Sequence, residues 1–256
     1  MNLFLNDKTA LVTGALKGLG KAICISLASE GVNIILNYRS NEKNDLMAIE
    51  FAKELEEKYS VKTLAIAADV SNENAVVKMF KTAVEKFNQI DILVNNAGVC
   101  PTSMVKDMPY DMFQQTLNIN LNGTFLCCKE MSKLITANNL QAKIINIVSQ
   151  AAFNGSATGK SQYSASKGAV VSFTLSLALE LASTKTCVNA VAPGLIRTEM
   201  VAESLIEKEA HYNKTIPLGR IAEVNEIADA VTFLASEKAN YITGSVLNIS
   251  GGLLLR

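Results

Sequence analysis

Short apolar runs alternate with longer segments of helical period along the whole chain. Runs such as Ile144–Val148 are almost continuous in apolar residues, as expected for strands that are buried on both faces. This alternation is typical of βαβ units, in which a helix carries the chain back across the sheet after each strand. The sequence therefore predicts an α/β fold with a doubly wound, seven-stranded parallel sheet and helices on both faces.

The pattern also gives the positions of the elements. Strands are expected at Thr9–Thr13, Asn33–Asn37, Lys62–Ala67, Ile92–Asn95, Lys143–Val148, Cys187–Val191 and Val246–Ile249. Helices are expected at Gly18–Ser29, Asp45–Tyr59, Glu73–Phe87, Asp111–Thr136, Tyr163–Leu181 and Val224–Ala235. Because the chain contains no linker, repeat or low-complexity tract, we expect residues 1–256 to form one domain.

The stretch 197–220 follows neither period. Its mixed polarity and its position before a Pro-Leu-Gly turn fit a mobile lid over a site. An ordinary pair of surface helices fits the composition equally well.

Charge and hydropathy exclude several classes of partner. The 24 basic residues balance the 24 acidic ones, so nothing favours nucleic acid or an anionic membrane. The first residues lack the basic start and long apolar run of a signal peptide, and no apolar stretch reaches the roughly 18 residues of a membrane span. We expect a cytoplasmic protein.

Cysteine and histidine usage argues against a metal site or a disulfide framework. The five cysteines have no Cys-x-x-Cys spacing, and we expect them to be small buried apolar residues. His211 is the single histidine, so it cannot form a histidine-rich metal site or, alone, a familiar catalytic triad. We expect it to lie on the surface or in a substrate loop.

A glycine-rich turn follows the first predicted strand, and a helix begins at once after it. Glycine allows positive φ and a close approach of the backbone to a phosphate, while the helix N-terminus offers unpaired N–H groups. This context predicts a dinucleotide pyrophosphate site. Its residues would be Gly14, Lys17, Gly18, Leu19 and Gly20.

The spacing Gly-x-x-x-Gly-x-Gly resembles that of the short-chain dehydrogenase/reductase family, and other motifs in the same order strengthen the resemblance. These motifs are Asp69-Val70, Asn95-Asn96-Ala97-Gly98, Tyr163-x-x-x-Lys167 with Ser149 upstream, and Pro193-Gly194. The resemblance covers essentially the whole chain. It implies a Rossmann-type fold and an oxidoreductase that uses a nicotinamide dinucleotide.

Tyr163 and Lys167 are four residues apart on a predicted helix, so their side chains share one face. A neighbouring ammonium favours the phenolate, which predicts that Lys167 lowers the pKa of Tyr163. The phenol would then protonate the oxygen of a ketone as a general acid.

The resemblance implies further roles. Lys167 would also hold the nicotinamide ribose, Ser149 would hydrogen-bond the substrate oxygen, and Asn120 would support a water-linked proton relay to the lysine. Asp69 and Val70 would contact the adenine, Asn96 the ribose region, and the backbone of Ile196 the nicotinamide carboxamide. The interval from Ser149 to Tyr163 is slightly longer than is usual in the family, which would affect the shape of the substrate pocket.

The end of the second predicted strand bears on the choice of cofactor. An enzyme that prefers NAD usually has Asp or Glu here to accept from the ribose 2′-OH. This chain reads Asn37-Tyr38-Arg39-Ser40, with no carboxylate. Arg39 and Lys17 would neutralise a 2′-phosphate, so NADP(H) is favoured over NAD(H).

The overall pattern is similar to 3-oxoacyl-[acyl-carrier-protein] reductases, which implies a 3-oxoacyl thioester substrate and a homotetramer. Where such enzymes commonly present arginines to the carrier protein, this chain has only Lys143 and Lys185. A small free ketone, as in acetoin or diol, hydroxysteroid or general carbonyl reductases, is therefore the alternative. A non-catalytic dinucleotide sensor is a remote alternative, because such a regulator would be expected to lose Tyr163 or Lys167. Surplus apolar residues in Phe125–Cys128 and Phe173–Leu181 favour subunit association.

Overall fold

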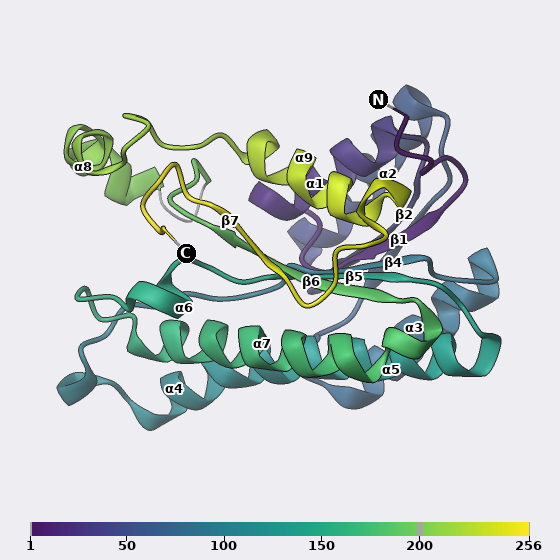
Figure 1. The fold of residues 1–256 in the computed structure, drawn as a ribbon, viewed down its shortest axis with the longest axis horizontal. Helices are drawn as coiled ribbons and strands as arrows, with labels where there is room; N and C mark the ends of the chain where they lie inside the picture. Colours follow the sequence, from purple (N-terminus) through teal and green to yellow (C-terminus); the bar gives the residue numbers. More distant parts are fainter. Residues whose placement is uncertain (1, 199–201, 256) are drawn as a thin grey trace.

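The computed structural model describes residues 2–198 and 202–255, and within α8 it describes side chains from Glu209 onward. Seven parallel strands form one sheet in the order β3-β2-β1-β4-β5-β6-β7, which confirms the predicted fold class (Figure 1). Their bounds are β1 Thr9–Val12, β2 Asn33–Tyr38, β3 Thr63–Ala67, β4 Ile92–Asn95, β5 Lys143–Ile147, β6 Cys187–Pro193 and β7 Val246–Ile249.

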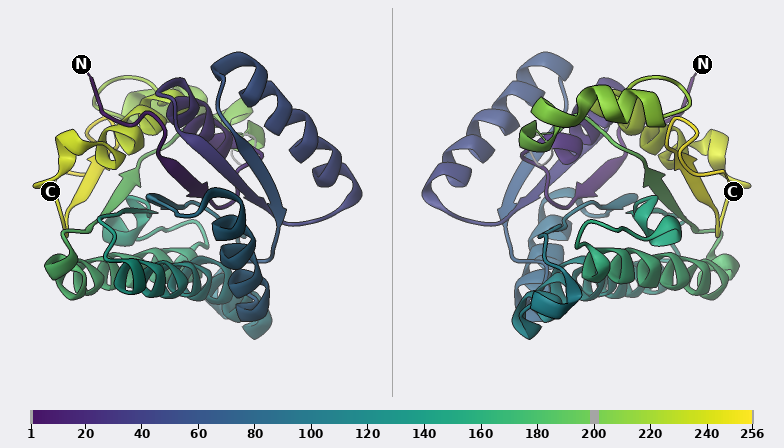
Figure 2. Two further views of the ribbon diagram at one scale, coloured as in Figure 1. Left: turned by 90° about the vertical axis from the view of Figure 1, so that its right-hand side faces the viewer. Right: turned by 90° about the vertical axis from the view of Figure 1, so that its left-hand side faces the viewer.

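Helices cover both faces of the sheet, and the views at right angles in Figure 2 show the sheet between two helical layers. One layer contains α1 (Gly18–Ser29), α2 (Glu42–Tyr59) and α9 (Val224–Ala235). The other contains α3 (Glu73–Phe87), α5 (Gly123–Asn138) and α7 (Ser161–Glu180). The other α-helices among the described residues are α4 (Tyr110–Leu117), α6 (Ala151–Asn154) and α8 (Ala202–Thr215).

Alternate strand residues face the two layers. Ala10 and Val12 of β1 pack with α1 and α9, whereas Leu11 between them packs with α3, α5 and α7. Each fully buried aliphatic side chain contributes about 1.5–3 kcal/mol to the free energy of unfolding. Burial on both faces is the reason that the central strands are apolar at nearly every position.

The predicted helix Asp111–Thr136 is not continuous α-helix. It consists of α4, a π-helical segment Asn118–Asn122 and α5. Hydrophobic period does not distinguish the i→i+5 turn of a π segment from an α turn, so the sequence analysis missed this change. Such segments occur often at functional sites, and this one contains Asn120.

Two other helices begin earlier than predicted. Helix α2 begins at Glu42 because the Asn41 side chain caps it, accepting from the N–H of Asn44 at 2.8 Å. Helix α7 begins at Ser161 instead of Tyr163. The predicted lid, 197–220, contains helix α8, while its positions 199–201 lie outside the described residues.

All five cysteines are free. Cys24, Cys127, Cys128 and Cys187 are buried as predicted, whereas Cys100 is only partly buried. His211 lies in α8 with its ring beside that of Tyr212. No helix among the described residues combines the length and the hydropathy needed to cross a membrane.

Candidate active site

The glycine turn after β1 has the geometry that a phosphate site requires. Gly14 and Gly18 have φ values of 64° and 49°. A Cβ on Gly20 would lie 2.1 Å from the carbonyl oxygen of Gly14, so only glycine allows α1 to begin this close to the turn. No side chain caps the N-terminus of α1, which leaves its N–H groups free to bind an anion. The turn fits a dinucleotide pyrophosphate.

Asn96 and Thr13 tie this turn to the end of β4. The Asn96 amide donates to the carbonyl oxygens of Thr13 and Gly14 at 3.0 and 3.1 Å. The Thr13 hydroxyl in turn accepts from the N–H groups of Asn96 and Ala97. Asn96 therefore positions the glycine turn, and Thr13 is a site residue that the sequence analysis did not single out.

The end of β2 lies against the same turn, because the Ala15 N–H donates to the Asn37 carbonyl oxygen at 2.9 Å. Arg39 and Lys17 are exposed, and neither has an ion-pair partner among the residues that the structure describes. Both side chains are therefore available to a phosphate.

A carboxylate also lies at the end of β2, which corrects the expectation that none is present. Asp45, in the first turns of α2, accepts from the Ser40 hydroxyl at 3.1 Å through Oδ1 and 3.0 Å through Oδ2. The residues that directly follow the strand, Arg39 and Ser40, carry no carboxylate. Helix α2 begins just after this segment, and its first turns bring Asp45 to the Ser40 hydroxyl.

The residues expected around the adenine and nicotinamide lie at two other strand ends. Asp69 and Val70 follow β3, and Asp69 Oδ1 accepts from the N–H and hydroxyl of Ser71. Ile196 follows β6 and forms a bridge with Ala222. In this bridge the Arg197 N–H donates to the Ala222 carbonyl oxygen, and the Ala222 N–H donates to the Leu195 carbonyl oxygen. The Ile196 N–H therefore has no backbone acceptor among the described residues and is available to a ligand.

Tyr163, Lys167 and Ser149 come together where β5 ends and α7 begins. The Lys167 ammonium donates to the carbonyl oxygen of Ile147 at 2.7 Å and lies 5.8 Å from the centroid of the Tyr163 ring. Lys167 is 4% exposed. Ser149 lies two residues after the end of β5 and accepts from the N–H of Ala151.

Burial dominates the electrostatics of this pair. The pKa of Tyr163 is raised to about 12, mainly by burial and to a smaller extent by the nearby Cys100, while a hydrogen bond with Ser149 opposes the rise. Burial lowers the pKa of Lys167 to about 8. The predicted lowering of the Tyr163 pKa by Lys167 is therefore not seen, because both groups are desolvated and the ammonium is directed at a carbonyl oxygen.

Asn120 is fully buried at the centre of a hydrogen-bond network. Its side chain accepts from the N–H of Val99 at 2.8 Å and donates to the carbonyl oxygen of Val99 and to the Ser166 hydroxyl, both at 3.0 Å. Ser166 donates to the carbonyl oxygen of Tyr163 at 2.7 Å. The network joins the π-helical segment, the loop after β4 and the first turns of α7. Ser166 was missed because a small polar residue inside a helix gives no sequence signal.

The segment before Tyr163 is held to the same loop after β4. The buried Gln162 amide donates to the carbonyl oxygen of Pro101 at 2.7 Å. The Ser103 N–H donates to the carbonyl oxygen of Gly159 at 2.8 Å. These bonds place the partly buried Cys100 beside the tyrosine and the two lysines Lys160 and Lys167, whose charges act on its thiol. The sequence predicts Gln162 only as the end of a pocket-lining loop, 150–162, and Cys100 only as a small buried residue.

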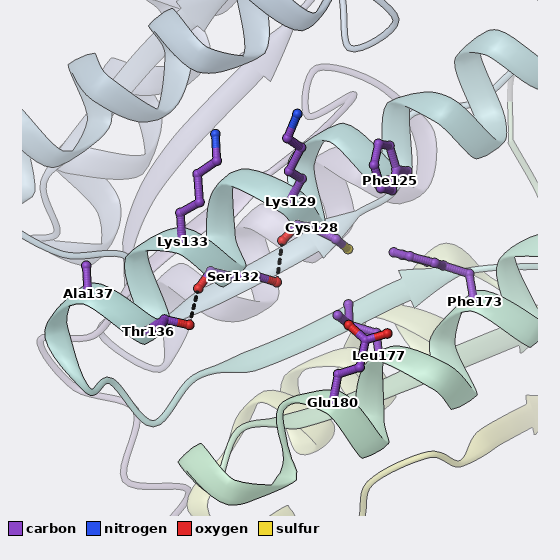
Figure 3. A pocket seen from close by; sticks show the side chains of 10 residues that line it. All are labelled: Phe125, Cys128, Lys129, Ser132, Lys133, Thr136, Ala137, Phe173, Leu177 and Glu180. Atoms are coloured by element: carbon purple, nitrogen blue, oxygen red, sulfur yellow. Dashed lines mark hydrogen bonds between the residues drawn. The ribbon is translucent and has the colours of Figure 1, made fainter.

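A groove of about 600 Å³ lies away from these residues, between α5 and the later half of α7 (Figure 3). Phe125 and Phe173 meet edge to face in it, with ring centroids 6.1 Å apart. Leu179 and Leu175 on the same helix α7 are 80% and 45% exposed. Lys129, Lys133 and Glu180 line the groove beside the two phenylalanines, and the groove is separate from the tyrosine and lysine.

Comparisons with known proteins agree with this geometry. The family model described as Enoyl-(Acyl carrier protein) reductase matches residues 14–254. A 3-oxoacyl-[acyl-carrier-protein] reductase of Synechocystis is 38% identical over 253 residues, which cover 98% of each chain. The enzyme of the same name from Aquifex aeolicus is 38% identical over 260 residues, covering 99% of this chain and 100% of the relative.

Other similar proteins carry different names. An L-rhamnose 1-dehydrogenase (NAD(P)(+)) of Azotobacter vinelandii is 32% identical over 255 residues, 99% of each chain. The crystal structure of a short-chain type dehydrogenase/reductase from Mycobacterium marinum superposes with a TM-score of 0.91 at 33% identity, covering 100% of this chain and 99% of that one. The chain therefore belongs to the short-chain dehydrogenase/reductase family and is an NAD(P)-dependent oxidoreductase.

Proposed function

We propose that this enzyme reduces a ketone to a secondary alcohol with NADPH, and that a 3-oxoacyl thioester is its first candidate substrate. The observation that carries the proposal is the meeting of Tyr163, Lys167 and Ser149 at the same edge of the sheet as the glycine turn. The relatives named 3-oxoacyl-[acyl-carrier-protein] reductase support a ketone substrate.

The cofactor would lie across the strand ends. The glycine turn and the N-terminus of α1 would hold its pyrophosphate, Asp69 and Val70 its adenine, and the Ile196 N–H its carboxamide. Arg39 and Lys17 lie near the end of β2 and have no ion-pair partner among the residues that the structure describes, which supports a preference for the 2′-phosphate of NADP(H). When bound, the nicotinamide supplies the hydride that reduces the carbonyl carbon.

The chain's own residues would bind the substrate carbonyl oxygen and donate a proton to it. Tyr163 stays protonated over the physiological pH range because burial raises its pKa to about 12, so it can donate to the substrate oxygen. Ser149 would hold that oxygen by a hydrogen bond. Lys167 would bind the ribose, and Asn120 would fix the tyrosine helix against the loop after β4 while supporting the proton relay.

A small free ketone is the second candidate substrate. The relative named L-rhamnose 1-dehydrogenase supports a small free substrate, because its name describes a sugar and no carrier protein, although the sugar carbon it names is not a ketone. Lys143 and Lys185 in place of arginines also weaken the argument for a carrier protein. The exposed apolar face of α5 and α7 supports assembly into a homotetramer.

The test of the proposed mechanism is Tyr163→Phe, with Tyr110→Phe as the matched control on an exposed tyrosine of α4. Oxidation of NADPH and NADH would be measured with acetoacetyl thioesters, acetoin, diacetyl and a steroid ketone. Loss of the phenol hydroxyl is expected to lower kcat by about 10²–10⁴ and to leave NADPH binding nearly unchanged. Substantial turnover by Tyr163→Phe would contradict the proposed proton donor.

The substrate panel distinguishes the two candidates. Fast reduction of the thioesters with NADPH would support the carrier-protein substrate, whereas turnover of only the small ketones would support a general carbonyl or diol reductase. Tight cofactor binding with no turnover of any compound would favour a dinucleotide sensor.

A further inference from the structure

Three charged side chains lie close to the end of β2, and they do not have the same sign. Arg39 directly follows the strand, Lys17 lies in the glycine turn, and Asp45 comes from the first turns of α2. Asp45 accepts from the Ser40 hydroxyl through both carboxylate oxygens, at 3.1 and 3.0 Å. The carboxylate also acts on Tyr38, whose pKa is raised first by burial and then by Asp45.

The position of Asp45 is fixed by the chain around it. Asn41 caps α2, and the Asn44 amide donates to the carbonyl oxygen of Arg39 at 2.8 Å. The loop from Arg39 to Asn41 and the first turn of α2 therefore form one hydrogen-bonded unit. The Asp45 carboxylate is held on Ser40 by the same fold that presents Arg39.

Ser40 stands where the ribose 2′ substituent is read in this kind of fold, about 20 residues after the glycine motif and past the end of the second strand. A free Ser40 hydroxyl would donate to a 2′-phosphate. In this structure it donates to Asp45 instead. Asp45 therefore places a carboxylate at the Ser40 hydroxyl, on the same hydrogen-bonded segment that carries Arg39.

We propose that Asp45 is a cofactor-specificity residue that weakens binding of NADP(H) and keeps NAD(H) usable as a second cofactor. The inference rests on the proposed dinucleotide site. A 2′-phosphate carries up to two negative charges and is repelled by the carboxylate, whereas the neutral 2′-OH of NAD(H) is not. The structure thus combines two cations that attract the phosphate with one anion that limits the attraction.

The test compares the wild-type protein with Asp45→Asn, which removes the charge and retains an oxygen to accept from Ser40. Dissociation constants for NADPH, NADH, 2′,5′-ADP and 5′-AMP would be measured by calorimetry at low salt. Asp45→Asn is expected to tighten binding of NADPH and 2′,5′-ADP by about three- to tenfold and not to tighten binding of NADH or 5′-AMP. High salt should reduce the difference, because it screens the charges.

Glu42→Gln is the matched control, since it removes another carboxylate from the first turn of α2 that makes no contact with Ser40. Thermal unfolding would verify that both variants fold. An unchanged ratio of NADPH to NADH affinity in Asp45→Asn, weaker binding of 2′,5′-ADP, or an equal change in Glu42→Gln would overturn the inference. A wild-type protein that prefers NADH would contradict the proposed NADPH preference alone, because the effect of Asp45→Asn is measured as a change in the ratio.

Discussion

At the scale of single residues, the site depends on groups whose ionisation is controlled by burial. Tyr163 and Lys167 are four residues apart, but their pKa values move in opposite directions from those of free side chains, to about 12 and about 8. Desolvation favours the neutral form of each group, and so it raises the pKa of an acid and lowers that of an ammonium. The phenol is thereby kept as a proton donor, while the lysine becomes the group that titrates near physiological pH.

This difference predicts how cofactor binding depends on pH. Lys167 loses its proton as the pH rises through about 8, while Tyr163 remains protonated up to about 12. If the ammonium holds the nicotinamide ribose, the affinity for NADPH should be constant below pH 8 and should fall above it. The dissociation constant would be measured from pH 6 to pH 10 in Tyr163→Phe, where this phenol cannot contribute.

A variant of the lysine provides the control for this experiment. In Lys167→Met the affinity should be lower, and the decrease above pH 8 should be absent. If the affinity of Tyr163→Phe for NADPH stays constant up to pH 10, the predicted decrease above pH 8 cannot be assigned to Lys167.

At the scale of elements, the site is made by the places where helices begin close to strand ends. Helix α1 begins within van der Waals contact of the turn after β1, and the π-helical segment places Asn120 against Val99 and Ser166. The first feature depends on Gly20, because a larger residue would collide with the Gly14 carbonyl oxygen. The second depends on the π-helical segment Asn118–Asn122, whose backbone differs from that of an ordinary α-helix.

The close start of α1 predicts the effect of Gly20→Ala. The added Cβ would meet the Gly14 carbonyl oxygen at 2.1 Å, and backbone must move to accommodate it. We expect a loss of roughly 1–3 kcal/mol in the free energy of unfolding and strongly weakened cofactor binding, because the turn is displaced. Urea unfolding and calorimetry would measure the two effects.

Gly168→Ala on α7 is the matched control. Its Cβ would lie 3.6 Å from the Ala152 carbonyl oxygen, an ordinary contact, and alanine favours the helix by up to about 1 kcal/mol. Equal losses in the free energy of unfolding for the two variants would contradict the prediction that the contact between Gly20 and the Gly14 carbonyl oxygen requires glycine.

At the scale of the whole molecule, the strand order determines where the functional residues meet. The order β3-β2-β1-β4-β5-β6-β7 reverses direction between β1 and β4. The connections from these two strands leave on opposite faces, so the glycine turn and the loop at Asn96 lie at the opening between them. Ligands of open α/β sheets bind at such a switch point.

The molecular surface leads to a prediction about assembly. Phe125 on α5 lines the groove of Figure 3 and is 45% exposed, and Leu179 on α7 is 80% exposed, so both helices present apolar side chains at the surface. If this face joins subunits, the wild-type protein should be a tetramer in light scattering, and a Phe125→Ser/Leu179→Glu variant should give smaller species. Leu46→Glu, on the exposed surface of α2, should leave the mass unchanged. A monomeric wild-type protein would rule out this assembly.

The sequence by itself determined the number of strands and their positions along the chain, because burial on both faces makes each strand a recognisable apolar run. It also identified the glycine turn from its place between a strand and a helix, and the pair Tyr163 and Lys167 from the ordered motifs that resemble the short-chain dehydrogenase/reductase family. The tertiary structure decided what no local pattern encodes. It brought Asp45 to Ser40, turned Lys167 toward Ile147, and linked Asn120 to Val99 and Ser166. These contacts join segments that only folding places together, and the burial that sets both pKa values exists only in the folded chain.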